Sequence, residues 1–170
     1  MAPFFKDDVE VLNYALTLEH LEAAFYTQAV ASGKLTGKNL AVFTIIRDDE
    51  VAHVTAISQG LAQAGATPVK PRASYNFAAL GDVNTEAGLL KIAALLEATG
   101  VAAYNGAGRE VTNKTILGVA GSIVAVEARH TGQLNALVDP NANPVPNAFE
   151  KAAKPQDILA AVTPILGPAQ

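Results

Sequence analysis

The 170-residue sequence contains no cysteine, and its only methionine is Met1. The absence of cysteine excludes disulfides, zinc fingers, iron–sulfur clusters and catalytic thiols. A chain without thiols is also indifferent to redox conditions, so the sequence leaves the cellular compartment open. Residues 1–6 are too short to form a signal peptide, although export to the periplasm or the extracellular space stays open if a signal peptide has been removed.

Basic residues are in the minority as well, with 12 lysines and arginines against 16 acidic residues and a net charge of −4. This acidic balance argues against a surface that binds nucleic acid or an anionic membrane. No segment approaches the roughly 18 uninterrupted apolar residues that a membrane span requires. We therefore expect neither nucleic acid nor a membrane as a partner.

The residues that are present favour helices in a single domain. Half of them are hydrophobic, alanine is abundant, and β-branched runs at strand spacing are scarce. Capping residues and glycines divide the first 138 residues into four expected helices: from Asp7–Asp8 to Gly33, from Thr36 or Lys38–Asn39 to Gly65, from Asn84 or Thr85 to about Gly106, and from Thr112 or Asn113 to Asp139. On the fourth helix the expected inward face runs from Val119 to Leu137.

Two segments lack helical periodicity. Residues 66–83 contain two prolines and a glycine, and a loop of this length fits a crossover between parallel helices of a bundle. Beyond residue 139 the chain is interrupted by prolines, and residues 148–154 and 156–162 are each expected to form a short helix. We therefore predict an all-α fold, with an antiparallel four-helix bundle over residues 1–138 and a proline-rich extension over residues 139–170 packed on it.

A Glu-x-x-His motif interrupts the apolar face of the second helix. Glu50 and His53 are three residues apart and so share one helix face, which continues through Phe43, Ile46 and Ile57. A carboxylate buried in such a face needs a cation or a proton, because an unpaired buried charge is costly. For a single motif, the more common explanation is a solvent-facing glutamate beside a satisfied histidine.

The same pattern, however, occurs twice in the chain. Leu18, Glu19 and Tyr26 match Leu96, Glu97 and Tyr104, and the pair Glu50 and His53 matches Glu127 and His130. The offset is 78 residues between the first glutamates and 77 between the second. An antiparallel bundle with one crossover brings all four glutamates and both histidines into one layer.

An ordinary structural explanation would have to hold for each of these residues in both halves. A lone glutamate is more often solvated, and a lone tyrosine is more often a core aromatic with its hydroxyl in water. Because the two halves repeat the same residues at matching spacing, a buried metal site is the better explanation. Its candidate ligands are Glu19, Glu50, His53, Glu97, Glu127 and His130.

One glutamate from each of two helices and one Glu-x-x-His from each of the other two is the ligand pattern of ferritin-like di-iron and di-manganese proteins. Residues 5–138 resemble the ferritin-like superfamily, and residues 18–26 (LEHLEAAFY) look like the desiccation-related ferritin-like family of bacteria, plants and fungi. The resemblance implies a ferritin-like bundle and carries the six candidates over as metal ligands. Members of that family are associated with stress and are often exported, while their reaction is not established.

Carboxylate and imidazole ligands without sulfur suit two iron or manganese ions, with zinc as an alternative occupant in vitro. The resemblance places one ion on Glu19 and His53 and the other on Glu97 and His130, with Glu50 and Glu127 bridging. We expect a separation of roughly 3.5–4 Å between the ions. Open positions on such a pair can bind dioxygen or peroxide, so the leading hypothesis is an oxidoreductase of the ferroxidase, peroxidase or catalase kind, with no catalytic residue beyond the metal site.

The absence of cysteine and of a methionine within the helices excludes some classes of protein within the superfamily. Without cysteine there is no rubredoxin-like centre, and Met1 is not the bundle-core methionine that holds haem in bacterioferritins, so we expect neither iron–sulfur nor haem. The proline-rich tail is unlike that of a shell-forming storage protein, although the sequence leaves the oligomeric state open, a homo-oligomer included. The alternative function is a non-catalytic stress protein that sequesters metal or uses it as a structural clamp.

Four further residues are expected beside the ligands: Tyr26, Tyr104, Asp49 and Glu22. In the di-iron proteins that the Asp-Glu-x-x-His run resembles, the aspartate supports the histidine of the partner helix. By that resemblance Asp49 accepts a hydrogen bond from His130. Val126 stands at the equivalent position in the other half and can accept nothing, so His53 requires a different partner.

Glu22 has no counterpart in the repeat. It lies one helical turn from Glu19, and the matching residue in the second half is Gly100. Four roles remain open for it: a seventh ligand, a proton relay, a carboxylate on the entry path, or a glutamate at the solvent edge of the bundle.

Overall fold

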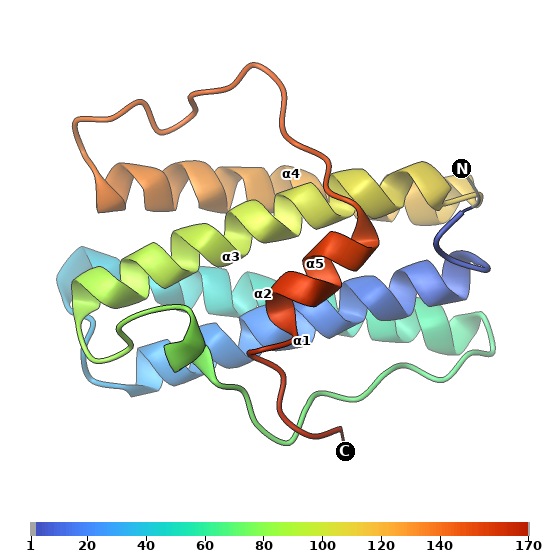
Figure 1. Ribbon diagram of the computed structural model, residues 1–170, viewed down its shortest axis with the longest axis horizontal. Coiled ribbons are helices and arrows are strands. Elements are labelled where there is room, and N and C mark those ends of the chain that lie inside the picture. Colours follow the sequence, from blue (N-terminus) through green and yellow to red (C-terminus); the bar gives the residue numbers. More distant parts are fainter. Residues whose placement is uncertain (1–2, 170) are drawn as a thin grey trace.

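The computed structural model describes residues 3–169, and four long helices account for most of them (Figure 1). They are α1 (Asp8–Ala31), α2 (Gly37–Gln63), α3 (Glu86–Ala107) and α4 (Lys114–Val138). α1 packs mainly against α2, and α3 packs mainly against α4. Because a long crossover connects α2 to α3, these two helices run in the same direction (Figure 1). The predicted all-α bundle with one long crossover is confirmed.

The helix ends lie where local signals in the sequence place them. The side chains of Asp7, Thr85 and Asn113 accept hydrogen bonds from backbone N–H groups in the first turns of α1, α3 and α4. Gly33 and Gly65 follow α1 and α2 with φ angles of 69° and 73°, a left-handed conformation that favours glycine.

The crossover is fastened to the bundle by aromatic packing. It contains a short 3₁₀ helix, η1 (Phe77–Ala79), and the buried ring of Phe77 packs edge-on against Phe25 of α1. The C-terminal residues pair with the crossover through isolated β-bridges between Tyr75 and Leu166 and between Arg72 and Ala169. Within residues 3–169 the structure contains no β-strand beyond such bridges.

The tail forms one of its two expected short helices. Residues 139–154 arch over α4 without regular structure, and α5 (Pro155–Val162) lies across the bundle with Ile158 and Val162 buried (Figure 1). Residues 148–154 are not helical, because the N–H of Ala153 donates to the carbonyl of Ala102 on α3 instead of to its own segment. This close approach requires glycine at position 106, where a Cβ would overlap the carbonyl oxygen of Ala153.

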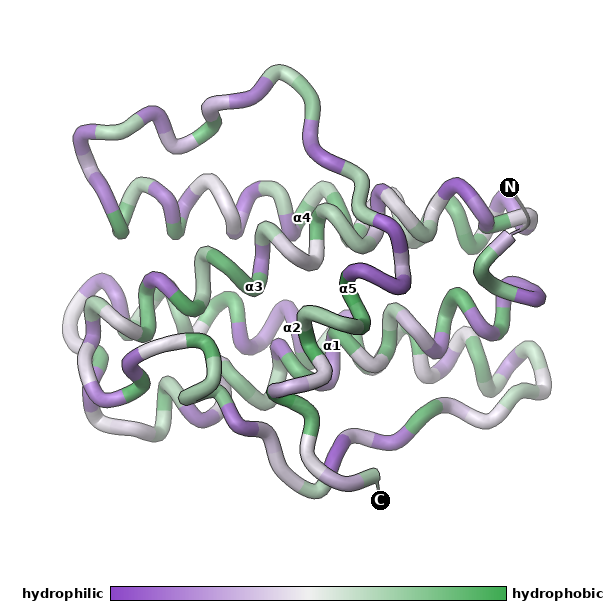
Figure 2. The backbone as a smooth tube through the Cα atoms, viewed as in Figure 1, coloured by the Kyte–Doolittle hydropathy of each residue, from purple (hydrophilic) through white to green (hydrophobic). Residues whose placement is uncertain are grey.

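Hydrophobic and hydrophilic residues are interspersed along the helices (Figure 2), and the side chains buried in the core are mainly hydrophobic. By length and hydropathy alone the stretch Glu86–Glu110 could cross a membrane, but half of its most apolar window is buried inside the bundle. One sequence expectation about the core is wrong. The periodicity of α4 predicts that Val119 faces inward, yet Val119 is 46% exposed, because the first half of α4 is only partly covered by the other helices.

Candidate metal centre

The six candidate ligands meet in one buried layer of the bundle. α1 and α3 contribute one glutamate each, and α2 and α4 contribute a glutamate and a histidine each: Glu19, Glu97, Glu50, His53, Glu127 and His130. The four glutamates are completely inaccessible to solvent, and the two histidines are buried as well. Their ligand atoms form two groups of four that share Glu50 and Glu127, and within each group all the atoms lie within 4.8 Å of one another.

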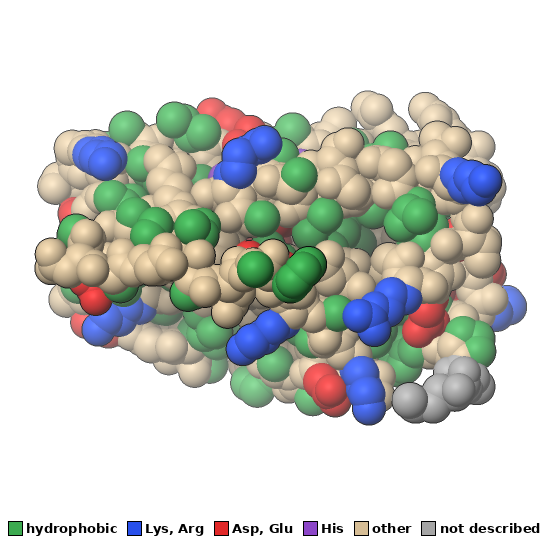
Figure 3. Space-filling model, turned by 90° about the horizontal axis from the view of Figure 1, so that it is seen from above, with side chains coloured by type: hydrophobic (Ala, Val, Ile, Leu, Met, Phe, Trp, Pro, Cys, Tyr) green, Lys and Arg blue, Asp and Glu red, His purple; other side chains and the backbone are tan. Residues whose placement is uncertain are grey.

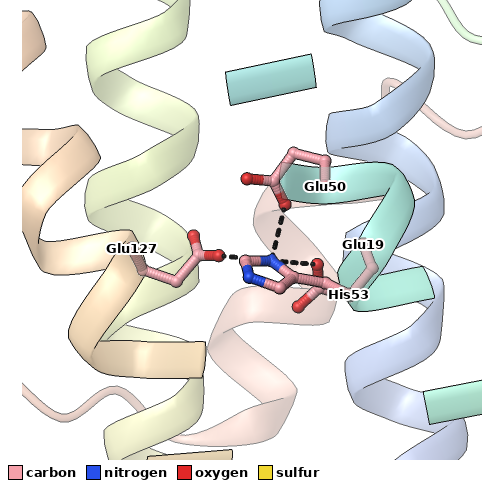
Figure 4. Close-up of side chains that lie close together, drawn as sticks. All are labelled: Glu19, Glu50, His53 and Glu127. Carbon is pink, nitrogen blue, oxygen red and sulfur yellow. Dashed lines mark hydrogen bonds and ion pairs between the residues drawn. The ribbon is translucent and has the colours of Figure 1, made fainter. Parts of the chain in front are cut away.

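The first group surrounds the Nδ1 atom of His53 (Figure 4). This atom lies 3.2 Å from Glu50 Oε2, 3.2 Å from Glu127 Oε1 and 3.3 Å from Glu19 Oε2. A single N–H cannot donate to three oxygens at once. Four ligand atoms placed tetrahedrally at about 2.1 Å from an ion would stand about 3.4 Å apart, so these spacings suit four ligands around one cation.

The second group repeats this arrangement around His130. Its Nδ1 atom lies 3.2 Å from Glu97 Oε2 and 3.3 Å from Glu50 Oε1. Glu50 therefore presents one carboxylate oxygen to each histidine, Oε2 to His53 and Oε1 to His130. A carboxylate that faces two ligand groups in this way is placed to bridge two ions.

The two histidines differ at their second ring nitrogen. His130 Nε2 lies 3.0 Å from Asp49 Oδ2, which is the contact predicted from the Asp-Glu-x-x-His run. No residue between 3 and 169 offers a hydrogen bond to Nε2 of His53. Asp49 therefore holds the ring of His130 in a fixed orientation, while His53 lacks this support.

The tyrosines connect the two halves of the repeat crosswise. The hydroxyl of Tyr26 on α1 donates to Glu97 Oε1 on α3 at 2.6 Å, and the hydroxyl of Tyr104 on α3 donates to Glu19 Oε1 on α1. In both glutamates the other oxygen, Oε2, faces a histidine. Each tyrosine thus orients the ligand that belongs to the opposite half.

Glu22 lies inside the centre and not at the solvent edge. It is 3% exposed, so the solvent-edge alternative is wrong. A Cβ added at Gly100 would lie 3.1 Å from Glu22 Oε1 and 3.0 Å from Glu127 Oε2, so the glycine leaves room beside both carboxylates. Glu22 belongs to neither group of four.

Burial sets the protonation of most of these carboxylates. It raises the pKa of Glu19 to about 7, raises that of Glu97, and raises those of Glu22 and Glu127 well above the ordinary value. The neighbouring carboxylates add to these shifts, because five acidic side chains share one apolar layer. The protein alone therefore holds protons in this layer.

For the two histidines and for Glu50, which lies between them, the pKa shifts in the direction opposite to the one that burial favours. Burial acts to raise the pKa of Glu50, but the imidazoles of His130 and His53 lower it to about 2. Burial acts to lower the pKa of the histidines, but the surrounding carboxylates raise that of His53 to about 12 and that of His130 to about 10. The raised pKa values of both imidazoles reflect the negative electrostatic potential that the carboxylates create in the layer.

Several buried oxygens of the layer have no hydrogen-bond partner among the described residues. They are Glu19 Oε2, Glu22 Oε2, Glu50 Oε1 and both carboxylate oxygens of Glu127. Three of them, Glu19 Oε2, Glu50 Oε1 and Glu127 Oε1, have only a histidine Nδ1 atom at 3.2–3.3 Å that other carboxylates share. Buried polar atoms without partners are costly, and cations would satisfy these oxygens. The residues present thus fit a metal site with oxygen and nitrogen ligands, a donor set that suits iron, manganese and zinc.

A family model described as a ferritin-like domain matches residues 7–140, a range that includes all six candidate ligands. The chain belongs to the ferritin-like domain family. This assignment agrees with the bundle, the crossover and the repeated ligand pattern.

Two solved structures share the ferritin-like fold of this chain at low sequence identity. A hypothetical protein from Methanococcus jannaschii is 16% identical, with a TM-score of 0.69 over 96% of this chain and 95% of that one. A conserved hypothetical protein from Mycobacterium tuberculosis is 17% identical, with a TM-score of 0.67 over 75% of this chain and 94% of that one. No functionally curated protein matches the sequence.

Proposed function

We propose that the protein is a dinuclear iron or manganese oxidoreductase that reacts with peroxide or dioxygen. The observation that carries the proposal is the presence of two overlapping groups of ligands that share Glu50 and Glu127. One ion would be held by Glu19 and His53, and the other by Glu97 and His130. When bound, a redox-active metal pair supplies electrons and open coordination positions to a small oxidant.

The protein's own residues would prepare this reaction. Tyr26 and Tyr104 hold Glu97 and Glu19 so that one oxygen of each stays directed at the centre. The apolar core excludes bulk water, which strengthens electrostatic interactions within the layer. Glu22 and Gly100 lie beside the ligand Glu127, and Glu22 is placed there to exchange a proton with a small oxidant.

The direct test is turnover by protein with measured metal content. Disproportionation of hydrogen peroxide to water and dioxygen needs no external reductant, so it is the first assay. Oxidation of added Fe(II) by dioxygen is the second, with Fe(II) itself supplying the electrons. We expect about two ions per chain and metal-dependent turnover, both lost in Glu127→Gln. Stoichiometric metal binding without turnover would overturn the proposal in favour of a structural clamp.

The proposal extends to a role in oxidative and desiccation stress, supported by the resemblance of residues 18–26 to the desiccation-related ferritin-like family. Cells that lack the protein should survive drying or peroxide less well than cells that carry it. Re-expression of the wild-type protein should restore survival, and re-expression of Glu127→Gln should not. Equal rescue by both proteins would separate the stress role from the metal centre.

A further inference from the structure

A second feature of the bundle lies outside the ligand layer. A cavity of about 530 Å³ occupies the end of the bundle where α1 and α4 begin and where α2 and α3 end. Its size falls within the range of pockets that hold small molecules in proteins. No motif in the sequence marks this region, because most of its lining residues are of the types that fill any helical core.

The lining of the cavity is mostly apolar and carries no charged side chain; its polar residues other than tyrosine are Gln59, Gln63, Asn113 and Thr115. Leu12, Ile57, Ile123 and several alanines form its walls. The mouth lies between α2 and α4, where the lining residues Gln59, Gln63 and Val119 are exposed to solvent. On the face that carries α4 and residues 139–154, hydrophobic side chains reach the surface between charged ones (Figure 3).

Two tyrosines, Tyr14 and Tyr104, line this cavity, and only one of their hydroxyls makes a hydrogen bond within residues 3–169. The hydroxyl of Tyr104 is occupied by its hydrogen bond to Glu19. Tyr14 is 7% exposed, and its buried hydroxyl has no hydrogen-bond partner within residues 3–169. Burial raises the pKa of Tyr14 above its ordinary value, so the hydroxyl keeps its proton and remains available as a donor. Unpartnered buried hydroxyls are uncommon in proteins, and an acceptor supplied by a ligand would explain this one.

We infer that the cavity binds a neutral, largely apolar small molecule with a single oxygen acceptor, such as a medium-chain alcohol or aldehyde, whose oxygen accepts from Tyr14. The ligand must be neutral because the lining offers no cation or anion to pair with a buried charge. This inference goes beyond the proposed function, since binding requires no metal. Tyr104 nevertheless forms a wall shared by the cavity and the metal centre, so a bound molecule would lie next to the hydrogen-bond partner of Glu19.

The test uses octan-1-ol as the probe. It is carried out on the full chain in two forms, metal-free and metal-loaded. Calorimetric titration should give saturable binding of one octan-1-ol per chain in both forms. Octanoate, which has the same chain length and a charge, should bind at least about tenfold more weakly. Tyr14→Phe should lower the affinity for octan-1-ol by about fivefold, the effect of losing one net hydrogen bond.

Two variants fill the cavity from opposite walls, Ala120→Phe on α4 and Ala56→Phe on α2. Both should abolish binding while circular dichroism shows unchanged helix content. Ala62→Phe is the matched control, because Ala62 is exposed on α2 and does not line the cavity. Ala56 lies at the exposed mouth, so this variant remains informative if Ala120→Phe fails to fold.

Several outcomes would overturn the inference. They are the absence of saturable octan-1-ol binding, binding that survives both filling variants, and octanoate binding as tight as that of the alcohol. Unchanged affinity in Tyr14→Phe would overturn the role of that hydroxyl. Sedimentation of the same samples tests a different occupant: a dimer that Ala56→Phe dissociates, without octan-1-ol binding, would assign the cavity to a subunit interface.

Discussion

His130 Nε2 lies 3.0 Å from Asp49 Oδ2, whereas Val126 occupies the position that is equivalent to Asp49 in the other half of the repeat. This pairing makes the two halves of the centre unequal. A carboxylate that accepts from a ligand histidine fixes its tautomer and orientation and strengthens it as a ligand.

Asp49→Ala should therefore weaken the ion held by His130 by about 10- to 100-fold and leave the other ion nearly unchanged. Calorimetric titration measures the two affinities, and anomalous scattering at limiting metal identifies the position that empties. Asp48→Ala is the matched control, because Asp48 pairs with Arg47 and is largely exposed. Equal weakening of both ions would show that Asp49 does not act through His130.

Replacing each tyrosine should weaken metal binding at the position whose glutamate it hydrogen-bonds, in the opposite half of the repeat. Tyr26→Phe removes the donor to Glu97 and should weaken the ion that Glu97 and His130 hold. Tyr104→Phe removes the donor to Glu19 and should weaken the other ion. We expect a loss of about tenfold in affinity at one position in each variant. The same titrations check this, and a loss at the opposite position would contradict the crosswise arrangement.

Glu22→Gln should separate metal binding from reaction. Glu22 lies outside both groups of four, so the variant should still bind two ions. Its peroxide turnover should fall by about 100-fold, since glutamine cannot transfer a proton. Metal analysis and steady-state assays measure the two properties, with Glu150→Gln at the exposed tail as control. A loss of one ion would make Glu22 a seventh ligand, and unchanged turnover would remove it from the mechanism.

The metal-free protein should lose stability as the pH rises. The pKa of Glu19 is raised in the folded state from 4.5 to about 7, so its contribution is fully present below pH 4.5 and is lost between about pH 4.5 and 7. The raised pKa values of His53 and His130 act in the same direction above pH 6.5. Glu50 acts in the opposite direction, but only below pH 4.5.

From pH 5 to 7.5 the free energy of unfolding of metal-free protein should therefore fall, with roughly 3 kcal/mol available from Glu19. Urea unfolding at a series of pH values measures it. Glu19→Gln should make the dependence less steep, because the glutamine cannot ionise while the other buried carboxylates still can. Metal binding displaces protons from its ligands, so the metal-loaded protein should become more stable over the same range. A metal-free protein that gains stability with pH would contradict the proposed protonation of the layer.

The helices and the six candidate ligands follow from the sequence by itself. Capping residues such as Asp7, Thr85 and Asn113 act within one turn of their own helix, so their effect is local and can be read directly. The repeat supplied long-range information as well. Two copies of the same polar residues at offsets of 78 and 77 place those residues at the same depth once the chain is a bundle with one crossover.

The tertiary structure alone decided which parts of each helix are covered and which atoms meet. Periodicity predicts that Val119 faces inward but cannot show that the start of α4 remains partly uncovered, since coverage depends on how the other helices lie. The burial of Glu22 and the crosswise hydrogen bonds of the tyrosines could not be predicted from the sequence for the same reason. The same holds for the hydroxyl of Tyr14, which has no hydrogen-bond partner within residues 3–169. Each of these features depends on distances between helices, and the residue pattern along one helix does not determine how far it lies from another.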